Sequence, residues 1–306
     1  MSNHDRIKTN GTMEVSELLK RVKRIEIKSK GLSQNIFSGQ YHSAFKGLGM
    51  AFSEVREYVP GDDIRSIDWN VTARFDNPYV KVFEEERELT VLLMIDISAS
   101  TSFGLVNDYK KNIIAEIAAT IAFSANQNND KIGVIFFSGK VEKFIPPKKG
   151  KSHILHIIRE IIAAEKTMPY SHLNEPIRFL FQAIKKRSIV FIISDFLLPL
   201  NFLEGLKICA KKHDIIAIKI NDKNEKELPN VGLLPLKDLE TQNLQWIDTS
   251  DKSTRTQLTA KFIQHSNELK QIFQKAKVDS IELFTHQNYI VPLSLLFKNR
   301  SSKKSL

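Results

Sequence analysis

"LTVLLMIDISAS", residues 89–100, contains the pattern that decides the fold. An uninterrupted apolar run of this kind is typical of a parallel β-strand that helices cover on both faces. The run stops at Asp96, and hydroxyl side chains follow at Ser98 and Ser100. The sequence therefore predicts a buried strand that ends in a carboxylate and passes into a tight loop.

Similar apolar runs recur along the chain. Residues 131–138, 188–195 and 214–221 each read as a strand, and segments with helical periodicity separate them. Strands that alternate with helices require right-handed crossovers, so we predict a doubly wound, mostly parallel α/β sheet of the Rossmann type. Residues 141–147 are expected to pair with this sheet as a hairpin edge. Residues 232–250 read as two short strands at another edge. Helices are expected at about 110–126, 152–164, 173–186, 202–212, 254–277 and 292–297.

The region before this alternation has a different composition. Residues 31–88 are polar, carry charges of both signs and contain strong turn signals. Residues 54–59 and 79–86 alternate apolar and polar side chains, as hairpin strands do. We therefore divide the chain into two parts. An N-terminal helix and a small irregular β-rich subdomain occupy residues 1–88, and an α/β domain occupies residues 89–306.

Several local expectations concern this N-terminal part. Residues 14–24 have helical spacing, whereas residues 24–29 alternate like a short strand. Trp69 is expected to pack between the two subdomains. We expect an internal network of ion pairs in the polar region, formed by Arg56, Arg65 and Arg74 with Asp62, Asp63 and Asp68. The alternative is that the same charged residues form a partner-facing or catalytic surface.

Composition limits the class of protein. The chain has 306 residues, 42% of them hydrophobic, which is enough for a sizeable core. Its only cysteine, Cys209, fits a reducing compartment, and the sequence contains neither a signal peptide nor an apolar run of roughly 20 residues. A cytoplasmic location is the expectation. The net charge of +10 is scattered and accompanies no nucleic-acid recognition motif, although it would allow peripheral association with a membrane.

Two strand-end acids point to a metal site. Asp96 and Asp195 each follow a continuous apolar strand, and ligands of parallel sheets bind at the carboxyl ends of the strands. If the two strands are neighbours, the carboxylates meet in one crevice, where Ser98 and Ser100 add hydroxyl oxygens. Such a donor set suits a hard cation, Mg²⁺ or Mn²⁺. The plainer alternative is a pair of strand-end acids beside helix-capping hydroxyls.

The run Asp-x-Ser-x-Ser at residues 96–100 resembles the metal-ion-dependent adhesion site of von Willebrand factor A domains. The resemblance implies that Asp96, Ser98, Ser100 and Asp195 surround the ion. It also implies a hydroxyl ligand from a second loop.

At the place of that second-loop hydroxyl, this chain reads Ser171-His172-Leu173. Ser171 is therefore the candidate ligand, and Thr167 is the fallback. If Ser171 is not a ligand, it would cap the helix that follows. His172 is expected to lie exposed at the start of that helix.

Residues 45–88 resemble the signature block of domain-of-unknown-function family 58, bacterial proteins that join this block to a von Willebrand A-like domain. The resemblance extends over nearly the whole chain, from about residue 15 to residue 300. It implies a partner of the MoxR-type AAA+ ATPase class and a role in protein maturation or stress response.

These features together favour a non-enzymatic interaction module. Its divalent cation would keep one coordination position open for an acidic side chain of a protein partner. Two alternatives remain open. One is a metal-dependent hydrolase or phosphoryl-transfer enzyme, for which a general base beside the ion would be the sign. The other is a structural scaffold whose metal site is vestigial.

Overall fold

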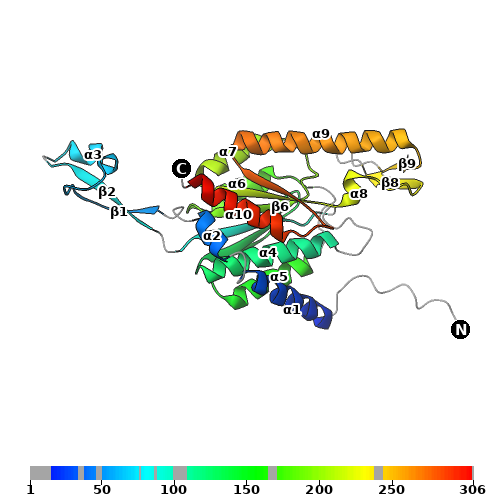
Figure 1. Cartoon of the computed structure of the whole chain (residues 1–306), viewed down its shortest axis with the longest axis horizontal. Coiled ribbons are helices and arrows are strands. Elements are labelled where there is room, and N and C mark those ends of the chain that lie inside the picture. The colour runs from blue at the N-terminus through cyan, green and yellow to red at the C-terminus, as the bar shows by residue number, and fades with distance from the viewer. Residues whose placement is uncertain are drawn as a thin grey trace.

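The computed structural model describes residues 15–33, 38–45, 50–75, 77–85, 88–98, 109–164, 171–237 and 244–304. A six-stranded sheet forms its centre, in the order β10-β7-β6-β3-β4-β5. The first five strands of this order are parallel, and β5 is antiparallel to β4. The strand bounds are β3 Thr90–Asp96, β4 Lys131–Phe137, β5 Val141–Lys148, β6 Ile189–Ser194, β7 Asp214–Asn221 and β10 Asp279–Phe284. The predicted mostly parallel α/β sheet is thus confirmed (Figure 1).

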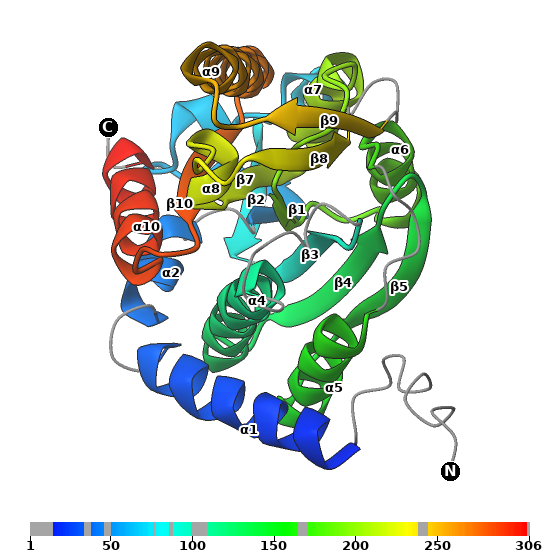
Figure 2. The ribbon, with the colours of Figure 1, turned by 90° about the vertical axis from the view of Figure 1, so that its right-hand side faces the viewer.

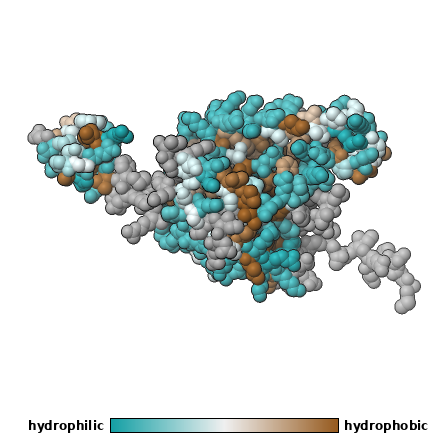
Figure 3. Space-filling model, viewed as in Figure 1, coloured by the Kyte–Doolittle hydropathy of each residue, from teal (hydrophilic) through white to brown (hydrophobic). Residues whose placement is uncertain are grey.

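Helices cover both faces of the sheet (Figure 2). One layer contains α1 Val15–Leu32, α2 Ser38–Phe45, α4 Tyr109–Gln127, α5 Lys151–Ala163 and α10 Ile290–Lys304. The opposite layer contains α6 Asn174–Ala183, α7 Leu203–Lys212 and α9 Lys252–Ala276. The outer surface of the 25-residue helix α9 is mostly hydrophilic in Figure 3, as expected for a helix that packs along one stripe only.

Strand β3 shows why a continuous apolar run is needed here. Its side chains alternate between the two core layers. Val91, Leu93 and Ile95 pack with α1, α4 and α5, whereas Leu92 and Met94 pack with α6, α7 and α9. All five are at most 1% exposed. Full burial of one such side chain contributes about 1.5–3 kcal/mol, so the central strand is a major source of stability.

Helix α1 corrects one prediction. Residues 24–29 are not a strand, because the helix continues from Val15 to Leu32. Within this segment Ile25 is buried and Ile27 is 66% exposed, which is a helical pattern. The two isoleucines imitate strand alternation only because one of them faces solvent. Helices α1 and α2 share their core with β3, while the predicted domain boundary at residue 88 stays a prediction.

An antiparallel pair, β1 Met50–Glu57 and β2 Tyr79–Glu85, projects away from the sheet (Figure 1). We call residues 50–85, which also hold the short helices η2 Ile64–Ser66 and α3 Trp69–Thr72, the arm. The hairpin strands predicted in this region are confirmed, with β1 beginning four residues earlier than expected.

Trp69 does not pack between subdomains, as had been expected: its side chain is 67% exposed on the arm. Of the predicted ion-pair network, the structure confirms the pair formed by Arg56 and Asp62, whose nitrogen–oxygen distances are 2.7 and 2.8 Å. Asp63 instead accepts a hydrogen bond from the backbone N–H of Arg65, and Asp68 pairs with Lys81 at 3.3 Å. Local capping thus replaces most of the expected network.

The root of the arm is fastened to the body just before β3. The backbone N–H of Leu89 donates to Asp130 Oδ1 at 2.9 Å, and the Lys131 N–H donates to the Leu89 carbonyl at 2.9 Å. Glu88 forms ion pairs with Lys131, at 3.1 Å, and with Lys149. The N–H and the carbonyl of Leu89 therefore both hold the chain at the start of β4.

Two further expectations need correction. The strands predicted around residues 232–250 are present as β8 Leu233–Lys237 and β9 Leu244–Asp248, but they form a separate two-stranded ribbon and not an edge of the main sheet. Helix α10 runs from Ile290 to Lys304, well past the end of the short helix expected at about residues 292–297. No helix within the described ranges is both long and apolar enough to cross a membrane.

Candidate functional site

The two strand-end acids lie on neighbouring strands, as predicted. Asp96 is the last residue of β3, and Asp195 directly follows β6. These strands pair in parallel, with Ile95 opposite Ile193. Both carboxylates are only 1% exposed. Both acids therefore lie at the carboxyl end of the sheet, at the ends of paired strands, and the negative charge of Asp195 raises the pKa of Asp96.

Hydrogen bonds hold each carboxylate in place. Asp96 accepts from the Ser98 backbone N–H at 2.9 Å and from the Ser194 hydroxyl at 2.7 Å. Ser194 in turn accepts from the Phe196 N–H at 2.8 Å. Phe196 has a φ of +53°, so the chain turns sharply after β6 through a conformation that is uncommon for a bulky residue. This turn directs both Asp195 and Ser194 into the crevice.

A buried lysine completes the charged cluster. Lys110, in the first turn of α4, is 1% exposed, and its Nζ donates to Asp195 Oδ2 at 3.2 Å and to Glu225 Oε1. Burial lowers the pKa of Lys110, but Asp195 and Glu225 outweigh this effect, so the pKa lies above its usual value. The lysine is therefore a fixed cation between two acids.

The sequence prediction missed Lys110, although a signal for it existed. Lys110 precedes Ile113, Ile114 and Ile117 by three, four and seven positions, which places it on the buried face of its helix. A lysine in phase with an apolar stripe is rarely buried without a partner. The partner Glu225 had no comparable signal, because its Asp222-x-x-Glu225 spacing reads only as a capping box.

The cluster contains more negative than positive charge. Asp195 and Glu225 contact the single ammonium of Lys110, and Asp96 lies near enough to Asp195 for their charges to interact. Burial, followed by the charge of Asp195, raises the pKa of Asp96 to about 6, and hydrogen bonds from Ser194 and Ser98 oppose the rise. Burial likewise raises the pKa of Glu225, against the effect of Lys110. With all three acids ionised the cluster carries a charge of −2, which one divalent cation would neutralise.

The second-loop residue Ser171 lies buried at the same edge of the sheet, one strand further along. Its hydroxyl donates to the carbonyl of Ser138, which follows β4, at 3.4 Å, and the His172 N–H donates to the same carbonyl at 3.1 Å. Helix α6 begins at Asn174 with Leu173 as its cap, so Ser171 does not cap it. Its role as a ligand stays a prediction, and Ser100 and Thr167 lie outside the described residues.

The chemistry of the donors fits a hard cation. The crevice offers carboxylate oxygens from Asp96 and Asp195 and the buried hydroxyl groups of Ser98 and Ser194. Ser194 was not predicted. Throughout the described ranges, no group of three or more His, Cys, Asp or Glu side chains is arranged to hold a metal. An ion in this crevice would therefore depend on two acids and on hydroxyls, a set that suits Mg²⁺ or Mn²⁺ and does not suit zinc.

The acidic network continues along the same edge of the sheet. The Thr285 hydroxyl, after β10, donates to Asp222 Oδ2 at 2.8 Å. The Asp222 N–H donates to Glu225 Oε2 at 2.8 Å, and Glu225 binds Lys110. A continuous set of hydrogen bonds thus joins the ends of β10, β7 and β6.

Comparisons with known proteins show distant likenesses of fold. BatB of Bacteroides thetaiotaomicron aligns with a TM-score of 0.42 and 12% identity, over 70% of this chain and 99% of that one. The VWA domain of SpRpn10 aligns with a TM-score of 0.41 and 9% identity, over 69% and 95% of the two chains. No function is transferred from either structure.

Sequence relatives are closer. The uncharacterized protein Rv1480 of Mycobacterium tuberculosis is 31% identical over 237 residues, which cover 76% of this chain and 74% of the relative. The uncharacterized protein YeaD of Bacillus subtilis is 28% identical over 125 residues, 41% of this chain and 28% of the relative. Residues 54–268 match the family described as "Protein of unknown function DUF58". The chain therefore belongs to the DUF58 family.

Proposed function

We propose that this protein is a metal-dependent protein-interaction module. One observation carries the proposal: a buried cluster of three carboxylates and one ammonium, lined by hydroxyls, at the carboxyl end of the central strands. Leaving a charge of −2 inside a protein is costly unless a cation balances it. A divalent ion supplies that balance without any further change in the chain.

The residues have distinct tasks in this proposal. Asp96 and Asp195 attract and hold the ion, directly or through water, and Ser98, Ser100 and Ser171 provide hydroxyl oxygens. Lys110 fixes the carboxylate of Asp195 in orientation through its ion pair. An ion held by these residues would supply Lewis-acid attraction for a carboxylate of a protein partner. The binding of the partner is then electrostatic capture and requires no bond cleavage.

The partner class comes from the resemblance of the chain to its family. We infer a MoxR-type AAA+ ATPase as the partner, in protein maturation or stress response. The crevice itself indicates only that the partner presents an acidic side chain. A reducing, cytoplasmic location accords with the single cysteine, Cys209, which is buried in the core.

The first experiment is calorimetric titration of Mg²⁺ and Mn²⁺ into the metal-free protein. Saturable binding is expected, and Asp96→Asn and Ser98→Ala should each abolish it or weaken it at least tenfold. Asp130→Asn is the matched control, because Asp130 is also buried and its pKa is also raised to about 6, mainly by burial, yet it lies at the opposite end of the sheet. Equal loss in the control would show that the variants act through folding.

The second experiment measures binding of a purified MoxR-type ATPase to the protein with Mg²⁺ and with a chelator. Binding that is lost with the chelator and in Asp96→Asn, but kept in Asp130→Asn, would support the proposed mode. Binding unaffected by metal would refute metal dependence and leave the interaction itself standing. Saturable metal binding without partner binding would refute the partner assignment alone.

A further inference from the structure

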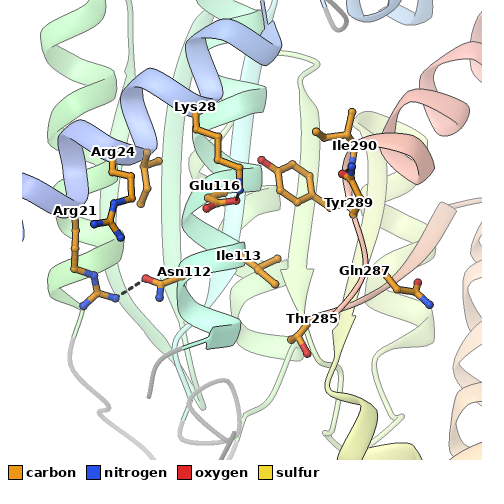
Figure 4. A pocket seen from close by; sticks show the side chains of 12 residues that line it. Arg21, Arg24, Lys28, Asn112, Ile113, Glu116, Thr285, Gln287, Tyr289 and Ile290 are labelled. Carbon is orange, nitrogen blue, oxygen red and sulfur yellow. Dashed lines mark hydrogen bonds and ion pairs between the residues drawn. The ribbon is translucent and has the colours of Figure 1, made fainter. Parts of the chain in front are cut away.

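A second concave site lies beside the hydrogen-bond network of the buried cluster, because Thr285 belongs to both. It is a pocket of about 360 Å³ between α1, the first turns of α4 and the loop that joins β10 to α10 (Figure 4). Small-molecule sites typically have volumes of roughly 300–1,000 Å³. We call it the α1 pocket, and nothing in the metal-dependent function requires it.

Helix α1 lines this pocket with three cations. Arg21, Arg24 and Lys28 are spaced by three and four residues, so the helix presents them on one face, and Figure 4 shows all three projecting toward α4. Arg21 binds the side-chain carbonyl of Asn112. Arg24 has no hydrogen-bond or ion-pair partner in the described part of the chain and is free to bind a ligand.

The described residues that line the pocket carry a net charge of +2. Glu116 is the only acidic residue among the described residues that line it, and it pairs with Lys28 at 2.5 Å. Two guanidinium groups and one ammonium against one carboxylate leave two positive charges. A phosphate monoester carries about −1.5 to −2 at neutral pH and therefore matches this balance, whereas a single carboxylate leaves one positive charge unmatched.

The geometry of the donors also favours phosphate. Guanidinium groups present two parallel N–H donors, an arrangement that matches phosphate oxygens. Apolar surface adjoins the cations: the side chains of Ile113 and Ile290 line the pocket, and the Tyr289 ring lies with its centroid 5.7 Å from Lys28 Nζ. A ligand with a charged head and an apolar or flat body would use both parts.

We propose that the α1 pocket binds the phosphate monoester group of a small molecule or of a lipid headgroup. Arg24 and Arg21 hold the phosphate oxygens, Lys28 adds its charge, and the wall formed by Tyr289 and Ile290 contacts the body of the ligand. The two sources share this chemistry and differ only in whether the ligand is soluble.

The test uses the full chain with inorganic phosphate, AMP and succinate as soluble probes in calorimetric titration. Saturable binding of AMP is expected, with succinate at least tenfold weaker. Arg24→Gln should weaken AMP binding about ten- to a hundredfold, because it removes charge-assisted hydrogen bonds. The matched control is Lys23→Gln, which removes the same charge from an exposed neighbour on α1 outside the pocket, and it should change the affinity less than about twofold.

A further variant acts in the opposite direction. Glu116→Gln raises the pocket charge to +3 and releases Lys28, so it should tighten AMP binding several-fold. If Glu116→Gln weakened binding, or if Arg24→Gln and Lys23→Gln had equal effects, the site would not be the one described. Absence of AMP binding to the wild type, combined with absence of Arg24-dependent binding to vesicles, would overturn the proposal. Equal affinity for succinate and AMP would overturn its phosphate specificity.

Vesicles distinguish the two sources. Co-sedimentation is measured with phosphatidylcholine vesicles that contain phosphatidic acid and with pure phosphatidylcholine vesicles. If the protein sediments with the first kind only, and Arg24→Gln abolishes this co-sedimentation while Lys23→Gln does not, the site binds a lipid headgroup. AMP binding without such sedimentation would assign the site to a soluble ligand.

Discussion

Removal of the Lys110 ammonium, in Lys110→Met, provides the sharpest test of the buried cluster. Methionine keeps most of the volume of the side chain and removes the only cation in contact with Asp195 and Glu225 among the described residues. Three buried carboxylates would then lie together without compensation. Breaking a buried ion pair from one side costs about 3–5 kcal/mol, because the remaining charge stays desolvated.

This cost is large compared with the stability of a typical domain, roughly 5–15 kcal/mol. In a large domain each kcal/mol of destabilisation lowers the Tm by about 2–4 °C, so the Tm of Lys110→Met should fall by roughly 6–20 °C. Thermal and urea unfolding, both monitored by circular dichroism, would measure the fall in Tm and the loss of unfolding free energy. Saturating Mg²⁺ should restore more stability in Lys110→Met than it adds to the wild type, because the variant cluster is more negative.

Lys111→Met is the natural comparison. Lys111 is adjacent on the helix but only partly buried, and its Nζ donates to the Ala164 carbonyl at 2.6 Å. Loss of one such hydrogen bond costs about 1–1.5 kcal/mol. If the unfolding free energy of Lys110→Met lay within about 0.5 kcal/mol of the wild-type value, Lys110 would not be the charge that compensates the buried acids.

Three further outcomes are expected. Because burial raises the folded-state pKa of Asp96 from its ordinary 3.8 to about 6, this residue should lower the unfolding free energy as the pH rises, by about 2 kcal/mol between pH 4 and pH 6 and by about 3 kcal/mol over its whole titration. Urea unfolding of Asp96→Asn at the same pH values should show a correspondingly smaller fall. Trp69→Ala should change stability by less than about 0.5 kcal/mol, since its side chain is exposed, whereas a packing role would cost about 3–5 kcal/mol in the same unfolding assay. Gly133→Ala should destabilise the sheet by about 1–3 kcal/mol, because the new Cβ would meet the Ile145 carbonyl oxygen at 2.8 Å; an unchanged Tm would contradict this.

The central strands could be predicted because a short run of sequence is enough to show that each of them is buried. A run such as residues 91–95 has no polar side chain, and only a strand covered on both faces buries every position of so short a segment. The neighbouring acids followed from the same logic, since parallel strands carry their carboxyl ends to one edge. The prediction that Asp96 and Asp195 lie at the ends of neighbouring strands is therefore confirmed.

What the sequence did not reveal depends on contacts between distant segments. Lys110 and Glu225 are 115 residues apart, and no periodicity links the start of α4 to a short helix after β7. The position of Trp69 was mistaken for a related reason. A large aromatic residue in a polar stretch is usually buried, and the direction in which the arm leaves the body is not a local property.

The root of the arm has a mechanical consequence. Strand β2 leads toward β3, so any load on the projecting hairpin would pull along the strand that ends at Asp96. Between the arm and β3 lie the ion pairs of Glu88 with Lys131 and Lys149 and then the two hydrogen bonds of Leu89, and these contacts would take up the load. Seven residues of extended strand, about 23 Å, separate Leu89 from Asp96. A force applied to the arm would therefore be borne by contacts with the body at the start of β3, before it reached the strand end at Asp96.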